Sequence, residues 1–127
     1  MLLSCLYIDQ SENMGRGVFT SEAIDRDTII EVSPVIVMTG EERKWLDKTS
    51  LHDYIFEWGK EKDHCCMAMG YVPVYNHSYR SNCEYEMNFE EKTIQIKTVR
   101  NISPHEELFI NYNGNWNDAT PLWFDAK

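Results

Sequence analysis

The sequence lacks a long apolar run and a basic start, the features that mark a membrane span or a secretory signal. Residues 1–6 have no basic flank, and Asp9 ends a stretch that is too short for either segment. Internal repeats, low-complexity tracts and Pro/Gly linkers are missing as well. We therefore expect a single intracellular domain, cytoplasmic or nuclear, with no signal peptide and no membrane segment.

Positive charge is also scarce. The 127 residues carry 12 Lys and Arg against 21 Asp and Glu, which gives a formal charge of -9. A protein that binds DNA or RNA normally presents a basic face, so the composition argues against direct contact with nucleic acid. It favours a cationic partner, such as a protein tail rich in Lys and Arg.

Cysteine is sparse and is not spaced for zinc. The four cysteines are Cys5, Cys65, Cys66 and Cys83. They form no CxxC pair and no Cys/His ladder, which predicts reduced thiols and no metal site. A metal- or thiol-dependent enzyme that uses His64, Cys65, Cys66 and His77 stays open as an alternative. Contiguous ligands rarely complete a tetrahedral site without a distant pair, which counts against it.

What the chain does have is a composition able to form a core. Its hydrophobic fraction is 43% and its aromatic fraction 13%. β-branched residues fill 28–38, where Pro34 predicts two short strands or a bent one. Alternation over Cys83–Phe89 and again over 94–97 predicts a hairpin, and Leu108–Ile110 predicts a last strand.

Helical signals are confined to the middle of the chain. Thr39 and Glu42 have capping-box spacing, which predicts a short helix that includes 43–46. Apolar residues then recur with helical periodicity at Leu51, Tyr54, Ile55 and Trp58. Periodicity alone predicts a second helix there. Together, the strand and helix patterns predict a mostly β domain with one or two short helices.

Three short motifs could carry chemistry, and each is weak alone. Gly15-Arg16-Gly17 lets a backbone approach a ligand, but without GxGxxG length or a P-loop Lys it indicates only a turn. Asn76-His77-Ser78 is by itself a polar loop with a satisfied histidine. The segment 107–112 ends a strand in Tyr112, which in isolation is a structural tyrosine. No GxSxG signature of a hydrolase is present.

Taken in order, these motifs resemble the SET-domain family of protein lysine methyltransferases. The resemblance is closest to short single-domain viral and bacterial members and runs from about Met14 to Tyr112. It rests on four segments: residues 15–19, residues 69–71, the NHS segment (residues 76–78) together with Asn82, and residues 106–112. It implies a β-clip fold of several small sheets, with a knot-like C-terminal arrangement that threads the NHS segment beside the last strand. The whole chain, 1–127, would be one SET domain, with a variable insert at about 39–63 and a short aromatic tail at 113–127.

The resemblance also implies the ligands of the site. S-adenosylmethionine, converted to S-adenosylhomocysteine, would be held by Gly15, Arg16, Gly17, Asn76, His77 and Trp116. Of these, Asn76 would act through its side chain, and His77 and the 15–17 segment through their backbone. Catalysis would fall to Tyr112 and Tyr54. The lysine channel would be lined by Tyr54, Tyr75, Tyr112, Trp123 and Phe124.

In one segment the family pattern and the periodicity disagree. Relatives have a strand around 53–56, where the periodicity predicts a helix, and we follow the resemblance because the segment is short and rich in aromatics. Tyr79, Ser81 and Asn111 replace a frequent cysteine, proline and aspartate, and we expect them to tune loop packing. No cysteine follows Tyr112, so a zinc-binding post-SET module is not expected, and its covering role would fall to the aromatic tail.

The function implied is methyl transfer from S-adenosylmethionine to the ε-amino group of a lysine in a basic protein. A histone tail is the first candidate, and a ribosomal or other basic protein is its rival. Short relatives also suggest a homodimer. Two alternatives remain: a SET-fold interaction module that has lost catalysis, and an unrelated β-rich interaction domain that carries the motifs by chance.

Overall fold

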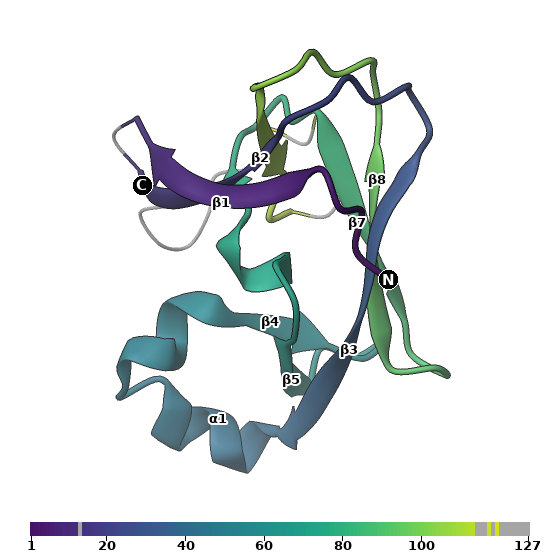
Figure 1. Ribbon diagram of the computed structural model, residues 1–127. Helices are drawn as coiled ribbons and strands as arrows, with labels where there is room; N and C mark the ends of the chain where they lie inside the picture. The colour runs from purple at the N-terminus through teal and green to yellow at the C-terminus, as the bar shows by residue number, and fades with distance from the viewer. Residues whose placement is uncertain (13, 114–116, 118, 120–127) are drawn as a thin grey trace.

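The computed structural model describes residues 1–12, 14–113, 117 and 119, and short strands dominate it (Figure 1). The strands are β1 (Leu6–Ser11), β2 (Gly15–Thr20), β3 (Ile29–Thr39), β4 (Ile55–Trp58), β5 (His64–Ala68), β6 (Asn76–His77), β7 (Cys83–Asn88), β8 (Thr93–Thr98) and β9 (Glu107–Ile110). The helical elements are α1 (Gly40–Leu46) and the 3-10 turns η1 (Ser50–Tyr54) and η2 (Val72–Val74). The fold is therefore mostly β, as predicted.

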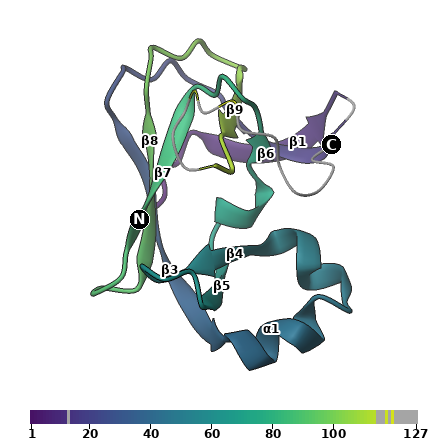
Figure 2. The ribbon, with the colours of Figure 1, turned by 180° about the vertical axis from the view of Figure 1, so that it is seen from behind.

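The first sheet brings the two ends of the described fold together. Its strand order is β1-β2-β9-β6, with antiparallel pairs except for β6 and β9. Those two run parallel, so that Asn76 lies opposite Phe109 and His77 opposite Ile110. Parallel neighbours need a long crossover, which here contains the β7–β8 hairpin. The NHS segment and the last strand thus lie side by side (Figure 2), as the resemblance implied.

The second sheet is organised around β3. Its order is β4-β5-β3-β8-β7, and β3 passes from the upper to the lower half of Figure 1. Residues 29–34 pair with β8 and residues 35–39 with β5, with a register shift between Ile29 and Glu31. The strand continues through Pro34, whose carbonyl still accepts a hydrogen bond from Met69 N. Of the two predicted forms, two short strands or a bent one, the structure has a single strand through Pro34, and its register shift lies nearer the start, between Ile29 and Glu31.

The two helix predictions have opposite outcomes. The capping box is confirmed: Thr39 Oγ1 accepts from Glu42 N at 3.1 Å, and Glu42 Oε2 accepts from Thr39 N at 2.8 Å. The second helix, predicted from periodicity over 51–58, is wrong. Only the turn η1 is helical, and strand β4 begins at Ile55 because its backbone pairs with β5. Long-range strand pairing overrides a helical period in so short a segment.

A buried carboxylate lies in the apolar core between the sheets. Glu31 is 0% exposed, and it accepts hydrogen bonds from Ser33 Oγ at 2.6 Å, Tyr71 N at 2.8 Å and the Tyr75 hydroxyl at 2.8 Å. Such a group is tolerated because every bond it needs is made inside the protein. A side chain at Gly70, where φ is +64°, would collide with this carboxylate. The network attaches the segment before the NHS motif to β3.

Within the part of the chain that the structure describes, no helix is long and apolar enough to cross a membrane.

Candidate active site

Tyr112, two residues after the end of β9, has all three of its polar groups hydrogen-bonded. The phenol donates to the backbone oxygen of Tyr75 at 2.8 Å. The backbone N–H donates to Nδ1 of His77 at 3.0 Å, and the backbone oxygen accepts from the Tyr85 hydroxyl at 3.1 Å. These partners come from segments far apart in the chain. The phenol is therefore held by the tertiary fold and not by its own loop.

Burial keeps the Tyr112 phenol protonated. It raises the pKa of Tyr112 to about 12, and the nearby Tyr54 and Asp53 push it in the same direction. The one proton of the phenol is committed to the carbonyl of Tyr75. A phenol oxygen that donates its proton can also accept a hydrogen bond. Tyr112 is suited to orient a ligand as a neutral acceptor and is not suited to act as a base near neutral pH.

His77 is a buried, neutral ring with one nitrogen unpaired. It is 7% exposed, and desolvation lowers the pKa of its imidazole. Because Nδ1 accepts from Tyr112 N, the proton of the neutral ring is on Nε2. Nε2 is buried and has no hydrogen-bond partner among the described residues. The ring also packs edge-on against Tyr79, with centroids 4.4 Å apart.

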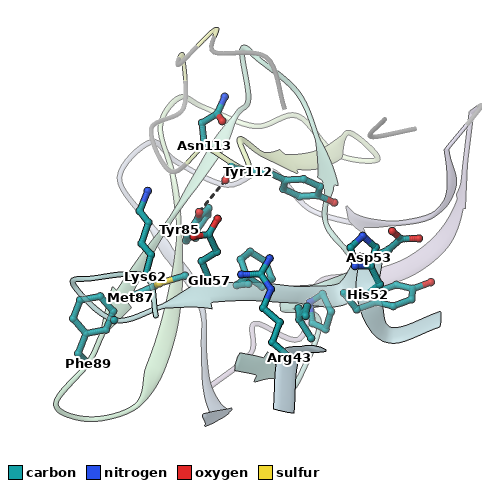
Figure 3. Close-up of a pocket in the computed structure, with 15 residues that line it drawn as sticks. Arg43, His52, Asp53, Glu57, Lys62, Tyr85, Met87, Phe89, Tyr112 and Asn113 are labelled. Carbon is teal, nitrogen blue, oxygen red and sulfur yellow. Dashed lines mark hydrogen bonds between the residues drawn. The ribbon is translucent and has the colours of Figure 1, made fainter. Parts of the chain in front are cut away.

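An aromatic cavity of about 390 Å³ opens in front of Tyr112 (Figure 3). Its aromatic lining consists of Tyr54, Phe56, Tyr85, Phe89 and Tyr112. Phe56 from β4 meets Tyr85 edge-on at 5.4 Å and Tyr112 at 6.4 Å between centroids. Burial raises the pKa of Tyr85 to about 12, so this hydroxyl also stays protonated. The walls favour a slender apolar chain, such as the methylenes of a lysine.

Charged side chains surround the cavity. Asp53, Glu57, Arg43 and Lys62 are all part of its lining (Figure 3). Arg43 is already paired with Asp47 at 3.8 Å. Neither Asp53 nor Glu57 has a salt-bridge partner within the described part of the chain. The lining thus combines two carboxylates with two cations, of which Arg43 is already paired, and the two carboxylates can attract a cationic ligand.

A second polar cluster lies where β2, β6 and β9 meet. Asn76 Nδ2 donates to the backbone oxygen of Arg16 at 3.1 Å and to Oε2 of Glu107 at 2.9 Å. Glu107 Oε1 accepts from Ser11 Oγ at 2.5 Å. A Cβ at Gly17 would collide with the Glu107 carboxylate and with Asn76 Nδ2. The second glycine of the GxG motif is therefore required by this cluster.

Gly15, the first glycine of the motif, is explained by its backbone conformation and not by a close contact. Gly15 adopts φ +71°, in the left-handed region that glycine enters without strain, and none of the described residues lies within 4 Å of the position its Cβ would take. Among the described residues, the backbone there borders open space. It is a surface that a ligand could approach closely.

The predicted site residues fall into three groups. Tyr54 and Tyr112 line the same cavity. Tyr75 does not: its ring is 0% exposed and its hydroxyl donates to Glu31, so only its carbonyl faces Tyr112. The Tyr75 ring therefore lies outside this cavity, because its hydroxyl donates to the buried Glu31 carboxylate. The C-terminal aromatics named for the site lie outside the described residues: Trp116, Trp123 and Phe124.

The unusual residues of the two motifs have defined contacts. Asn111, which is 0% exposed, donates from Nδ2 to Tyr79 O at 3.2 Å and accepts from Asn113 N at 2.9 Å. Ser81 Oγ donates to the backbone oxygen of Cys83 at 2.6 Å. The bond from Asn111 to Tyr79 joins the loop after β6 to the loop after β9, whereas the other two bonds are local. That the substitutions tune loop packing stays a prediction.

Three residues of the site were not singled out by the sequence: Phe56, Tyr85 and Glu107. The alternation over Cys83–Phe89 placed Tyr85 on one face of a strand, but nothing local related that face to Tyr112. Glu107 belongs to the 106–112 motif on which the resemblance rests, but the sequence assigned it no contact in the site. Their positions follow from β4, β7 and β9 converging in space, which a local pattern does not report.

The thiols do not form a reactive centre. Burial raises the pKa of Cys66 to about 12 and also raises the pKa values of Cys65 and Cys83. Buried protonated thiols are poor nucleophiles and poor ligands. His64 pairs with Asp63 at 2.9 Å, while His77 is committed to Tyr112. Residues 1–12 and 14–113 contain no group of three or more His, Cys, Asp or Glu placed to hold a metal.

The comparisons with known proteins agree with this geometry. Residues 15–113 match the SET domain family. A Schizosaccharomyces pombe protein named histone-lysine N-methyltransferase, H3 lysine-37 specific, is 32% identical over 100% of this chain and 82% of its own length. The Halocynthia roretzi histone-lysine N-methyltransferase SETD7 is 26% identical over 91% of this chain and 34% of its own.

A solved structure from Plasmodium falciparum, described as a histone methyltransferase, superposes with a TM-score of 0.68 at 28% identity. It covers 91% of this chain and 98% of its own. The chain belongs to the SET-domain family of protein lysine methyltransferases.

Proposed function

We propose that this chain transfers the methyl group of S-adenosylmethionine to the ε-amino group of a lysine in a histone tail. The observation that carries the proposal is the Tyr112 phenol, protonated and hydrogen-bonded to the Tyr75 carbonyl, in the lining of an aromatic cavity. Carboxylates in that lining and relatives named as histone-lysine methyltransferases support the substrate class. A ribosomal or other basic protein is the rival substrate.

The cavity would favour the reactive form of the lysine. The nucleophile must be the neutral amine, and removing a proton from a lysine of pKa ≈ 10.4 at pH 7 costs roughly 4–5 kcal/mol. Phe56, Tyr85 and Tyr112 would present ring surface to a bound lysine, and desolvation lowers the pKa of an amine. The lining carboxylates Asp53 and Glu57 would attract the charged amine.

Tyr112 and Tyr54 would then orient the amine. The Tyr112 oxygen can accept from an amine N–H, since its own proton is given to Tyr75. Such a bond directs the nitrogen lone pair away from the phenol and toward the methyl donor. Near-attack positioning of this kind is worth roughly 7–11 kcal/mol. Tyr75 would contribute its carbonyl to this arrangement, not its ring.

The residues around β2 and β6 fit the methyl donor. Bound there, S-adenosylmethionine would supply an electrophilic methyl on a sulfonium. Asn76 Oδ1 and His77 Nε2 are an acceptor and a donor without partners among the described residues, and open space borders Gly15. We assign the holding of the donor to the backbone of 15–17, to Asn76 and to His77, with Trp116 as cover. No metal is assigned a role.

The domain limits and the assembly are part of the same proposal. The insert at 39–63 contains α1, η1 and β4, and it supplies Arg43, Tyr54 and Phe56 to the cavity wall. It would therefore determine which peptide is accepted. The aromatic tail at 113–127 keeps its proposed covering role and lies mostly outside the described residues. A homodimer is predicted and would be tested by light scattering. Histone methylation would require the protein to reach the nucleus or newly made histones.

The test is transfer of labelled methyl groups to core histones and to a ribosomal protein extract, with Tyr112→Phe as control. Lysine labelling that disappears in the control supports the proposal and names the substrate class. The rival is a SET-fold interaction module without catalysis. Absence of labelling together with absence of cofactor binding by calorimetry would favour that rival.

A further inference from the structure

The amide of Asn76 has a fixed orientation. Its side chain is 8% exposed, and its two hydrogen bonds both run from Nδ2, to Arg16 O and to Glu107 Oε2. A carbonyl and a carboxylate can only accept, so the NH₂ end of the amide must face them. The oxygen end must then face the opposite way. Within the described residues nothing donates to Asn76 Oδ1, so its partner must be a hydrogen-bond donor.

Glu107 is the residue that completes this arrangement. It reaches from β9 across the glycine at position 17, where any side chain would occupy its place. Ser11 Oγ and Asn76 Nδ2 hold its two oxygens, at 2.5 Å and 2.9 Å. No Lys or Arg of the described residues forms a salt bridge with it. A negative charge is therefore held beside the free amide oxygen without a cation to balance it.

We propose that Glu107 is a positioning residue for the amino-acid end of the cofactor: it fixes Asn76 with its oxygen outward and supplies the negative charge that a primary ammonium group requires. The inference rests on the proposed function. An outward acceptor beside a carboxylate selects a cationic donor over a neutral one, because a charge-assisted hydrogen bond is about twice as strong. The adenosine end of the cofactor carries no ammonium and does not depend on Glu107.

A purely structural Glu107 would behave differently. Its bonds also join β1, β6 and β9, so losing them could loosen the whole sheet. That loss would weaken every ligand of the site alike. Two ligands separate the roles: S-adenosylhomocysteine, which has the amino-acid end, and 5′-methylthioadenosine, which has the same nucleoside without it.

The experiment measures the Kd of both ligands by calorimetry for the full chain and for Glu107→Gln, a variant of the same shape without the charge. We expect binding of S-adenosylhomocysteine to weaken about tenfold, the loss typical of a hydrogen bond to a charged group, and 5′-methylthioadenosine to be unchanged. The matched control is Glu106→Gln. The side chain of Glu106 bonds Arg100 and Ser103 N on the surface, so neither Kd should change.

A second variant tests the same role in case the Glu107→Gln protein does not fold. Ser11→Ala removes one of the two bonds that hold the carboxylate, and it should give a smaller loss with the same selectivity for S-adenosylhomocysteine. Equal losses for both ligands, or none for either, would overturn the role of Glu107. A wild-type chain that binds neither ligand would instead overturn the proposed function.

Discussion

At the scale of single residues, the site depends on side chains whose protonation is fixed by burial. Tyr112 and Tyr85 have pKa values raised to about 12, and the pKa of His77 is lowered. Each is therefore neutral at physiological pH, and each gives or takes a defined hydrogen bond. The chemistry assigned to the cavity needs such neutral groups, because a charged neighbour would bind the amine without orienting it.

Replacing Tyr112 by Phe should lower kcat by about 100-fold, since it removes the acceptor for the amine in the transition state. The cofactor Kd should change little, because the bonds that Tyr112 N and O make are retained. Rates of labelled methyl transfer and calorimetry measure the two quantities. Tyr7→Phe, on β1 and stacked on Phe19, is the matched control and should leave both unchanged. Unreduced turnover in Tyr112→Phe would remove this residue from the mechanism.

His77 should make stability and activity depend on pH. Burial lowers its pKa below the ordinary value of about 6.5, so the unfolded chain takes up a proton before the folded protein does. Its contribution to stability is therefore complete above pH ~6.5 and is lost as pH falls toward the lowered pKa. Protonation of Nδ1 would also break the bond from Tyr112 N.

The check is urea unfolding between pH 5 and 8 for the wild type and for His77→Asn, which keeps an acceptor near Nδ1 but does not titrate. The difference in unfolding free energy should shrink as the pH falls. All other residues are the same in both proteins, so their contributions cancel in the comparison. A pH-independent difference would contradict this account of His77.

At the scale of elements, β9 is held by a side chain as well as by strands. Asn82 donates to Glu107 O at 2.8 Å and accepts from Phe109 N at 2.7 Å, so it occupies the place of a neighbouring strand. It is 2% exposed, and removing it would leave two buried backbone groups without partners. The strand that ends next to Tyr112 thus depends on the loop after the NHS segment.

Asn82→Ala should destabilise the protein by about 2–4 kcal/mol, for two lost buried hydrogen bonds. Thermal unfolding followed by circular dichroism measures the effect. Asn88→Ala is the matched control, because Asn88 accepts a bond from Glu91 N in an exposed turn. Equal melting temperatures for the two variants would show that the two hydrogen bonds of Asn82 to β9 do not stabilise the protein.

At the scale of the whole molecule, the negative charge of the protein can attract a basic substrate over a distance. The chain has a formal charge of -9, and the carboxylates Asp53 and Glu57 lie at the cavity without salt bridges among the described residues. A basic tail would be drawn to this face from solution. Salt should screen the attraction, since the Debye length falls from about 30 Å at 0.01 M to about 10 Å at 0.1 M.

The double change Asp53→Asn and Glu57→Gln should raise KM for a basic peptide several-fold at low salt and leave kcat nearly unchanged, because it acts on encounter and not on chemistry. The difference from wild type should disappear at about 0.5 M salt. Asp25→Asn, an exposed carboxylate far from the cavity lining, serves as control. A KM that rises equally at all salt concentrations would indicate direct contact instead of steering.

Local patterns determined several features of this protein. The capping box at Thr39, the hairpin of β7 and β8, and the last strand follow from spacings of a few residues. The ordered motifs around Gly15, Asn76 and Tyr112 were enough to indicate the family, because each motif is a short segment whose residues act together.

Tertiary structure decided the rest. The parallel pairing of β6 with β9 joins residues that lie far apart in the chain, and no local period predicts it. The same holds for β4, which pairs with β5 against its helical period. Tyr75 turned into the core because a buried carboxylate accepts its hydroxyl, and Tyr85 entered the site because two sheets converge there. Spacing reports the local backbone, whereas a cavity depends on which distant side chains the fold brings together.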